Sequence, residues 1–445
     1  MPKITHRKKR LSSFKLIVLG FAGVIVLGAL ILMLPFSSTA GVVTPFHEAL
    51  FTSTSAVCVT GLVVQDTGSY WSAFGQTVIL LLIQIGGLGV VTVAALFAML
   101  SGRKISLMQR STMQDAISAP KVGGIVRLTR FIVRGTFLIE LIGMIVMLPT
   151  FCGNYGIKGI WMAAFHSVSA FCNAGFDILG TAENKYPSLT GYIGNPAINI
   201  AIMLLIIVGG IGFLTWDDIY TNKWHFKKYR MQSKVILVTT AILIIAPAVF
   251  FFFCDFTGLP LAERILASLF QSVTPRTAGF NTADLPAMTG FSKAIMTLLM
   301  LVGGSPGSTA GGMKTTTLAV LILSAFSVCR KKDDAEVCGR RIDGSTVKNA
   351  AAVAVMYFLL FFVGGIVIST AEGLPLSTCL YETASAVGTV GLTLGITPQL
   401  GVLSQLILIV LMYLGRVGGL TLIYAAVSNK NQSGAKLPLE KITVG

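Results

Sequence analysis

Long apolar runs alternate with short polar segments along the whole chain. A helix needs about 20 apolar residues to cross the hydrocarbon core of a membrane. We predict membrane-spanning helices at Phe14–Pro35, Thr77–Leu100, Ile200–Leu214, Val235–Phe253, Val353–Ile368 and Val402–Ala426. The first run follows the basic stretch Met1–Arg10, as in a secretory signal peptide, but it is longer than the about 7–15 apolar residues of such a peptide. It is therefore interpreted as an uncleaved first span.

One short segment recurs four times between these runs. Each copy is too short to span a membrane, and its penultimate residue is glycine. The copies are FTSTSAVCVTGL at Phe51–Leu62, FHSVSAFCNAGF at Phe165–Phe176, LFQSVTPRTAGF at Leu269–Phe280 and YETASAVGTVGL at Tyr381–Leu392. A glycine cluster follows each copy in the next apolar run, after a longer interval in the second copy than in the others. The pattern predicts a unit of helix, half-helix, glycine turn and helix.

Four such units define the predicted fold class, an all-α polytopic membrane protein with four M1–P-loop–M2 repeats. The repeats would supply eight spanning helices and four pore half-helices around one pseudo-fourfold pore. We place repeat 1 at 1–122, repeat 2 at 123–232, repeat 3 at 233–342, and repeat 4 with a cytoplasmic C-terminal tail at 343–445.

The composition agrees with this fold class. Of the 445 residues, 54% are hydrophobic and 12% are charged, whereas soluble proteins contain about 25% charged residues. The net charge is +16, but the Lys and Arg residues cluster in alternate loops. The segments Pro35–Gln76 and Ala371–Leu420 contain no Lys or Arg except Arg416. Because this alternation follows the positive-inside rule, we predict that both termini are cytoplasmic and that nucleic acid is not a partner.

The sequence indicates neither an enzyme nor a nucleotide-binding chain. The seven cysteines form no CxxC pair and the four histidines are dispersed, so no disulfide framework or metal-ligand cluster is predicted. No HExxH motif is present. The stretch GGSPGSTAGGMKTT resembles a phosphate-binding loop only superficially, because Met313 separates Gly312 from Lys314 and breaks the required spacing.

The glycine turns carry the predicted chemistry. A half-helix that ends at the membrane centre directs the partial negative charge of its C-terminus at a cation, and the backbone after it presents carbonyl oxygens. The predicted filter backbone is Cys58, Val59, Thr60, Gly61, Cys172, Asn173, Ala174, Gly175, Arg276, Thr277, Ala278, Gly279, Gly388, Thr389, Val390 and Gly391. These stretches contain no acidic residue, which favours a carbonyl filter for a monovalent cation. The alternative, that the glycines only permit close helix packing, explains one or two of them but not four at equivalent positions.

The loop endings VTGL, NAGF, TAGF and TVGL, and above all TPRTAGF at Thr274–Phe280, resemble the Trk/Ktr/HKT superfamily of potassium transporters. The resemblance covers nearly the whole chain and is greatest to the bacterial KtrB-type membrane subunit. It implies K⁺ uptake across the plasma (inner) membrane, and glycine rather than serine at Gly61 implies selectivity for K⁺. K⁺ would be bound by the carbonyl groups of Val59, Thr60, Asn173, Ala174, Thr277, Ala278, Thr389 and Val390.

The resemblance also implies partners. The family forms homodimers with one pore per protomer, embedded in membrane lipid. A cytosolic ring of RCK-type subunits, which binds ATP, ADP or another nucleotide, regulates uptake, so no nucleotide is expected on this chain. Some members depend on Na⁺, which leaves Na⁺ open as an activator. A secondary transporter of another monovalent cation or a small solute is the alternative function, since broken helices also occur in that class.

The last helix of repeat 3 is predicted to be interrupted by GGSPGSTAGGMKTTT at Gly303–Thr317, because glycine and proline are poor helix formers. By resemblance this stretch is an intramembrane gating loop, and Arg416 stands beside it. The predicted gate residues are Gly303, Gly304, Ser305, Pro306, Gly307, Gly311, Gly312, Lys314 and Arg416. A static broken helix is the alternative for the loop, and a brace to a carboxylate is the alternative for Arg416.

Other charged residues lie near the predicted pore. We expect the Arg276 side chain to turn away from the filter and to pair with a carboxylate such as that of Glu382. Acidic residues on or near the predicted outer side either concentrate cations or are ordinary acids at helix N-termini. These residues are Glu48, Asp66, Asp177, Glu263 and Glu382.

Overall fold

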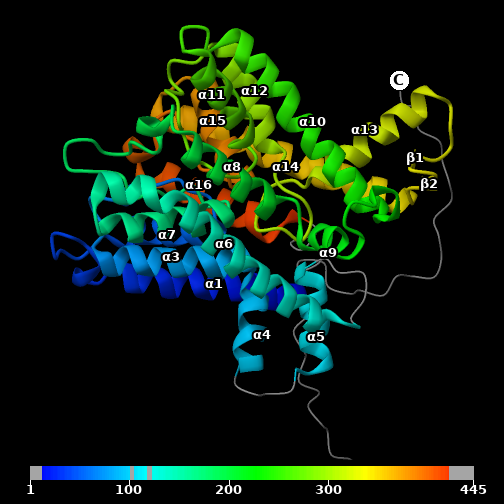
Figure 1. Cartoon of the computed structure of the whole chain (residues 1–445), viewed down its shortest axis with the longest axis horizontal. Coiled ribbons are helices and arrows are strands. Elements are labelled where there is room, and N and C mark those ends of the chain that lie inside the picture. The colour runs from blue at the N-terminus through cyan, green and yellow to red at the C-terminus, as the bar shows by residue number, and fades with distance from the viewer. Residues whose placement is uncertain (1–12, 101–104, 118–122, 420–445) are drawn as a thin grey trace, which may run out of the picture.

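The computed structural model describes residues 13–100, 105–117 and 123–419, which are predominantly helical (Figure 1). These residues contain sixteen α-helices. A short antiparallel hairpin of β1 (Glu336–Val337) and β2 (Arg340–Arg341) precedes the last group of helices. The predicted basic N-terminal stretch and the predicted C-terminal tail lie outside the described residues.

The helices form four groups with the same order of elements. In each group a long helix precedes a short one, and one or two further helices follow. The first two groups are α1 (Ser13–Leu32), α2 (Phe46–Cys58), α3 (Ala73–Leu88) and α4 (Val90–Leu100), then α6 (Ile125–Tyr155), α7 (Lys158–Phe171), α8 (Pro196–Gly210) and α9 (Phe213–Asn222). The last two are α10 (Met231–Cys254), α11 (Leu261–Val273), α12 (Gly290–Leu301) and α13 (Thr315–Cys329), then α14 (Gly344–Glu372), α15 (Leu376–Gly388) and α16 (Val402–Val417).

Short elements join these groups. Helix α5 (Leu107–Ile117) lies between the first two groups, and Figure 1 shows it extending with α4 from the body of the molecule. The 3-10 turns are η1 (Pro35–Ser37), η2 (Thr190–Tyr192), η3 (Phe226–Lys228) and η4 (Thr397–Gln399). The predicted repeat boundaries stay predictions, and α10 begins slightly before its boundary, at Met231.

Four helices, α1, α6, α10 and α14, are long and apolar enough to cross a membrane. Two helix pairs, α3 with α4 and α8 with α9, pass the same criterion only together, and each pair is bent by 98°. The described residues therefore contain up to six spans by length and composition. The prediction of a helical chain with several apolar spans is confirmed, whereas the count of eight spans stays a prediction.

Three predicted continuous spans are shorter or broken in the structure. Helix α3 ends before Gly89 (φ +85°), α8 ends before Gly212 (φ +92°), and α16 ends before Gly418 (φ +86°). Residues with side chains rarely adopt such angles, so each glycine marks the end of a straight helix. The predicted run Val402–Ala426 is thus helical only to Val417, and its last residues lie outside the described part of the chain.

The four groups form a closed ring. Helix α3 of the first group contacts α7 of the second, α8 contacts α11 of the third, α12 contacts α15 of the fourth, and α16 contacts α2 of the first. The long helices expose large apolar side chains such as Leu19, Ile145, Ile242 and Phe358, as expected for helices that face lipid. The short helices are the most buried elements, so the centre of the ring is built from their C-terminal ends.

Candidate functional site

The predicted glycine turns share one unusual backbone conformation. Each repeat glycine has a positive φ, and so does the residue two positions before it. The pairs are Val59 (φ +57°) and Gly61 (+94°), Asn173 (+59°) and Gly175 (+68°), Thr277 (+72°) and Gly279 (+79°), and Thr389 (+52°) and Gly391 (+94°). Because left-handed angles are uncommon for residues other than glycine, their recurrence at four equivalent positions shows that the turns are built alike.

The four turns meet edge to edge. A Cβ atom placed on Gly61 would overlap the Ala174 carbonyl oxygen of the next turn, and one on Gly175 would overlap the Ala278 oxygen. In the same way Gly279 abuts the Val390 oxygen, and Gly391 abuts the Thr60 oxygen, which closes the circle. Glycine is required here for close approach as well as for its backbone angle. We call Gly61, Gly175, Gly279 and Gly391 the glycine ring.

Hydrogen bonds hold the amide groups of the turns against their own helices. The amides of Thr60, Ala174 and Val390 donate to helical carbonyl oxygens six residues before the ring glycine, each over 2.8 Å, and Ala278 donates to Thr274 over 3.0 Å. The preceding helix thus satisfies these donors. The carbonyl groups that abut the glycine ring remain directed at the neighbouring turn.

In each repeat a hydroxyl group of the short-helix segment also forms a hydrogen bond with the backbone of the turn. The Ser55 and Ser385 oxygens accept hydrogen bonds from the amides of Gly61 and Gly391, each over 3.0 Å. The Ser169 hydroxyl instead donates to the carbonyl oxygen of Phe176 over 2.8 Å. In the third copy, which lacks this serine, the Thr274 hydroxyl donates to Phe280 over 2.5 Å. The sequence shows this recurring serine, but its role appears only in the structure.

The structure therefore brings all four predicted filter stretches together. The carbonyl groups of Thr60, Ala174, Ala278 and Val390 lie at the glycine ring. The binding of K⁺ there, and by the carbonyl groups of Val59, Asn173, Thr277 and Thr389, stays a prediction. The filter side chains are buried among the short helices.

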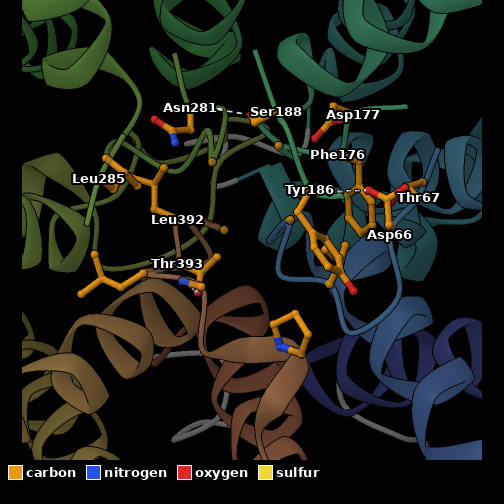
Figure 2. A pocket seen from close by; sticks show the side chains of 18 of the residues that line it. Asp66, Thr67, Phe176, Asp177, Tyr186, Ser188, Asn281, Leu285, Leu392 and Thr393 are labelled. Atoms are coloured by element: carbon orange, nitrogen blue, oxygen red, sulfur yellow. Dashed lines mark hydrogen bonds between the residues drawn. The ribbon is translucent and has the colours of Figure 1, made fainter. Parts of the chain in front are cut away.

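A cavity of about 230 Å³ opens on one side of the glycine ring (Figure 2). We call it the Asp66 cavity. Its lining includes the four ring glycines, Asp66, Asp177, Tyr186, Asn281 and Thr393. Burial raises the pKa of the Asp177 carboxyl to about 7, and the negative charge of Asp66 adds to that rise. Of the predicted acidic residues, Glu48, Glu263 and Glu382 are not among the lining residues.

One loop of the second group (181–189) crosses beside this cavity and joins three groups. The backbone amide of Tyr186 donates a hydrogen bond to the Asp66 carboxylate over 2.9 Å. The backbone amide of Asn281 donates one to the Ser188 hydroxyl oxygen, also over 2.9 Å. Figure 2 shows both contacts at the cavity wall. Neither Tyr186 nor Ser188 belongs to a motif in the sequence. The longer interval between Gly175 and Gly209 was the signal that an extra loop is present there.

The predicted break in the third group is present. Helix α12 ends at Leu301 and α13 begins at Thr315, so residues 302–314 are non-helical. We call this stretch the intramembrane loop, after its predicted position. Its backbone is bonded to the ends of neighbouring helices, since the Ser305 amide donates to Gly210 over 2.9 Å and the Gly312 amide donates to Gly415 over 3.2 Å.

The intramembrane loop contacts the turns from the side away from the Asp66 cavity. The Thr309 hydroxyl donates to the carbonyl oxygen of Phe171 over 3.0 Å and accepts a hydrogen bond from the Asn173 amide group over 3.1 Å. A Cβ atom on Gly311 would overlap the Thr389 side chain. Thr309 was not among the predicted gate residues, because no sequence feature separates it from the other small residues of the loop.

A second cavity, of about 240 Å³, lies beyond the loop. Its lining includes Lys314, Arg416, Asp115, Tyr357 and the loop glycines Gly307 and Gly312, and we call it the Lys314 cavity. It shares no lining residue with the Asp66 cavity. Among the described residues, the intramembrane loop therefore stands between the two cavities.

Arg416 and Lys314 both bond the intramembrane loop. The Arg416 guanidinium donates to the carbonyl oxygens of Thr309 and Gly86, and to that of Gly87 over 3.3 Å. The Lys314 ammonium donates to the Ala310 carbonyl oxygen over 2.8 Å. No ion pair joins Arg416 to a carboxylate in the described part of the chain. Arg416 is thus bonded to carbonyl groups of the loop and of α3, and the brace to a carboxylate is not formed among the described residues.

The expected ion pair between Arg276 and Glu382 is not formed. The Glu382 carboxylate instead accepts hydrogen bonds from the hydroxyl groups of Thr393 and Thr397. The Arg276 side chain is buried, and it lines a small cavity with Thr240 and Gly304. Its Nε atom has no hydrogen-bond partner within the described residues.

Comparisons with known proteins agree with this architecture. The sequence profile of a family described as TrkH, cation transport protein, matches residues 13–434. The chain is 39% identical to the potassium/sodium uptake protein NtpJ of Enterococcus hirae, over 98% of each chain. It is 37% identical to the Ktr system potassium uptake protein B of Bacillus subtilis, over 97% of this chain and 96% of the relative.

A solved structure shares the fold. The crystal structure of the potassium transporter TrkH from Vibrio parahaemolyticus matches with a TM-score of 0.74 and 19% identity, and the match covers 96% of this chain and 87% of that one. The family predicted from the loop endings is confirmed. The chain belongs to the TrkH family of cation transport proteins and, with its apolar spans, is a multi-pass membrane protein.

Proposed function

We propose that this protein carries K⁺ into the cell through the glycine ring. The observation that carries the proposal is the closed circle of four turns with the same backbone conformation, in which each ring glycine abuts a carbonyl group of the next turn. Rings of backbone carbonyl oxygens replace the hydration shell of a dehydrated cation. The two cavities on either side would be the outer and inner ends of the pathway, and the Asp66 cavity would face outward.

The intramembrane loop would be the gate. It lies between the two cavities, and its backbone is held by single hydrogen bonds to helix ends rather than by a continuous helix. Arg416 and Lys314 add bonds from side chains. Withdrawal of 302–314 towards the Lys314 cavity would join the two cavities into one path.

The name of one relative supports a system of several components. The B. subtilis relative is described as part of a Ktr system. We propose that two copies of this chain form a homodimer in the plasma membrane, with cytoplasmic termini, and that a cytosolic RCK-type ring binds the nucleotide. Basic segments at one membrane face would receive that ring.

Na⁺ transport is the second candidate, because the E. hirae relative is described as a potassium/sodium uptake protein. The test is ⁸⁶Rb⁺ and ²²Na⁺ uptake in bacterial cells that lack their own K⁺ uptake systems, with and without external Na⁺. The variants are the natural chain and Gly61→Ser. A hydroxymethyl group on Gly61 would enter the space of the Ala174 carbonyl oxygen, so Rb⁺ uptake should fall or Na⁺ uptake should rise.

The outcomes separate the candidates. Saturable Rb⁺ uptake that Gly61→Ser weakens supports a carbonyl filter for K⁺. Higher Rb⁺ uptake in the presence of Na⁺ would identify Na⁺ as an activator, whereas comparable ²²Na⁺ entry would identify it as a second substrate. No uptake by well-expressed natural protein, even with an RCK-type partner supplied, would reject the proposal and favour a transporter of a small solute.

A further inference from the structure

A carboxyl group is completely buried behind the fourth turn of the ring. Glu382, in α15, has no exposed surface. One of its oxygens accepts a hydrogen bond from the Thr393 hydroxyl over 2.9 Å, and the other accepts one from the Thr397 hydroxyl. Both threonines belong to the segment that follows Gly391. Thr393 also lines the Asp66 cavity, where Figure 2 shows it.

The position of Glu382 recurs in all four short helices. A hydroxyl of the residue after it bonds the long helix of its group: Ser53 to Ile25, Ser167 to Glu140, Ser272 to Ile244, and Thr383 to Phe361. These four bonds fix the register. The residues equivalent to Glu382 are therefore Thr52, His166 and Gln271, which are all polar and have no exposed surface. In the third copy the bond from Ser272 places this residue one position nearer the ring glycine than in the other three copies.

Only two of these four side chains tie a helix to its turn among the described residues. Glu382 accepts a hydrogen bond from Thr393, which lies two residues after Gly391. The side-chain amide of Gln271 donates one to the side-chain oxygen of Asn281, two residues after Gly279, over 3.2 Å. Within the described part of the chain, the Thr52 hydroxyl has no hydrogen-bond partner. The turns of the third and fourth repeats are thus held from behind, whereas the described residues provide no such tie for the first.

His166, the equivalent residue in the second repeat, does not tie its turn. Its Nδ1 atom contacts the Met162 carbonyl oxygen over 2.7 Å within its own helix, and its Nε2 atom has no hydrogen-bond partner in the part of the chain that the structure describes. The side-chain hydrogen bonds behind the glycine ring therefore differ among the four repeats, although the backbone conformations of the turns are alike.

The Glu382 contacts are costly to break. A buried polar group that loses its hydrogen bonds retains the full cost of its desolvation, and among the described residues Glu382 forms no ion pair that would compensate. Each threonine hydroxyl lies within hydrogen-bond distance of a different carboxyl oxygen, and the two hydroxyl groups lie 3.0 Å from each other. The segment from Gly391 to Thr397, in which Gly391 and Gly395 have positive φ, is held in place by these two bonds.

We propose that Glu382 is a positioning residue for ion selectivity. It holds Thr393 and Thr397, and through them it keeps Gly391 against the Thr60 carbonyl oxygen. Loss of this tie lets the fourth turn withdraw from the ring, so the oxygens no longer keep the spacing that distinguishes K⁺ from the smaller Na⁺. This inference rests on the proposed function.

The test is a double-mutant cycle on Glu382→Met and Thr397→Val, read as the ratio of ⁸⁶Rb⁺ to ²²Na⁺ uptake in the cells described above. Methionine nearly preserves the size of glutamate but can bond neither threonine, and valine removes the Thr397 hydroxyl. Each single variant should lower the ratio at least about threefold, and the double variant should lower it no further than Glu382→Met alone, because methionine already removes the bond that Thr397 forms. Thr393→Val provides a second route if Glu382→Met is absent from the membrane.

Thr52→Val is the matched control, because the Thr52 hydroxyl occupies the same place in α2 and has no hydrogen-bond partner among the residues that the structure describes. It should retain the natural ratio. The inference is overturned if the Glu382 and Thr397 variants keep the natural ratio at normal membrane levels, or if their effects add. Natural protein that takes up neither ion overturns the proposed function and this inference together, whereas natural K⁺ selectivity that the variants retain overturns the inference alone.

Discussion

The Arg416 guanidinium in α16 donates a hydrogen bond to the Thr309 carbonyl oxygen in the intramembrane loop. The same group donates to the Gly86 carbonyl oxygen at the end of α3. One side chain thereby joins the first, third and fourth groups at the point where the two cavities are separated. The planar guanidinium suits this contact, because its donors point in fixed, different directions.

Arg416→Gln should raise Rb⁺ uptake in the absence of a regulatory partner. Glutamine is shorter and cannot bond both carbonyl groups, so the loop loses a contact that favours the closed arrangement. Hydrogen bonds to a charged group contribute about 1.5–3 kcal/mol, and an increase of roughly tenfold is expected if most of one such bond is lost. Tyr357→Phe is the control, since Tyr357 lines the same cavity but bonds Gly415 rather than the loop. Unchanged or lower uptake in Arg416→Gln would contradict this role.

Gly175→Ala should abolish Rb⁺ uptake. The new Cβ atom would lie 2.5 Å from the Ala278 carbonyl oxygen and 2.9 Å from the Gly279 Cα atom. Backbone atoms of the next turn would have to move, and the positive φ adds about 1–2 kcal/mol for a residue with a side chain. Gly23→Ala in α1 is the control, because nothing lies within 4 Å of its Cβ position. Normal uptake by Gly175→Ala would show that the ring tolerates a wider spacing.

Part of this site could be predicted from the sequence because the turns require glycine at fixed positions. Gly61 and its three equivalents are needed both for positive φ and for close approach, and four occurrences at matching positions exclude coincidence. The residues with positive φ two positions before these glycines cannot be recognised from the sequence in this way. Val59 and Thr389 are β-branched, and nothing in their identity indicates a positive φ.

The glycine clusters illustrate the opposite difficulty. Helix packing was an alternative for the repeat glycines, and within the clusters Gly86 and Gly209 do allow close approach, since their Cβ positions meet the carbonyl oxygens of Val57 and Phe171. Gly89 and Gly212, three residues later, end the helices instead. Packing and helix breaking both favour glycine, so composition alone could not assign one role to each position.

Uptake should depend on pH through Asp177. The pKa of its carboxyl is raised to about 7 by burial and by the charge of Asp66. The group is therefore mostly neutral at pH 6 and mostly charged at pH 8, and a negative charge at the Asp66 cavity raises the local cation concentration. Rb⁺ uptake at low external Rb⁺ should increase about two- to threefold from pH 6 to pH 8, and high salt should reduce the difference.

Asp177→Asn should remove this pH dependence and hold uptake at the lower level. The exposed carboxylate of Asp284, which lines a different cavity, provides the control variant Asp284→Asn. A pH profile that persists in Asp177→Asn would assign the titration to another group.

Asp66→Ala should destabilise the loop 181–189 that crosses beside the Asp66 cavity, here called the crossing loop. The Asp66 carboxylate accepts hydrogen bonds from the Ser69 amide and hydroxyl, each over 2.7 Å, and from the Tyr186 amide over 2.9 Å. Removal of the carboxylate leaves these donors without that acceptor and should lower the free energy of unfolding by about 1–3 kcal/mol. The melting temperature of detergent-purified protein should fall, and limited proteolysis within 181–189 should become faster.

The variant that isolates this effect is Asp66→Asn, whose side-chain amide keeps one carbonyl oxygen as an acceptor but carries no charge. If the loop is held by hydrogen bonds, the asparagine variant should recover part of the melting temperature that the alanine variant loses. If both variants melt like the natural protein, other contacts hold the loop, of which the bond between Ser188 and Asn281 is the first to test. A Ser188→Ala substitution would then accelerate proteolysis where Asp66→Ala does not, and the crossing loop would be anchored from the third group rather than from the first.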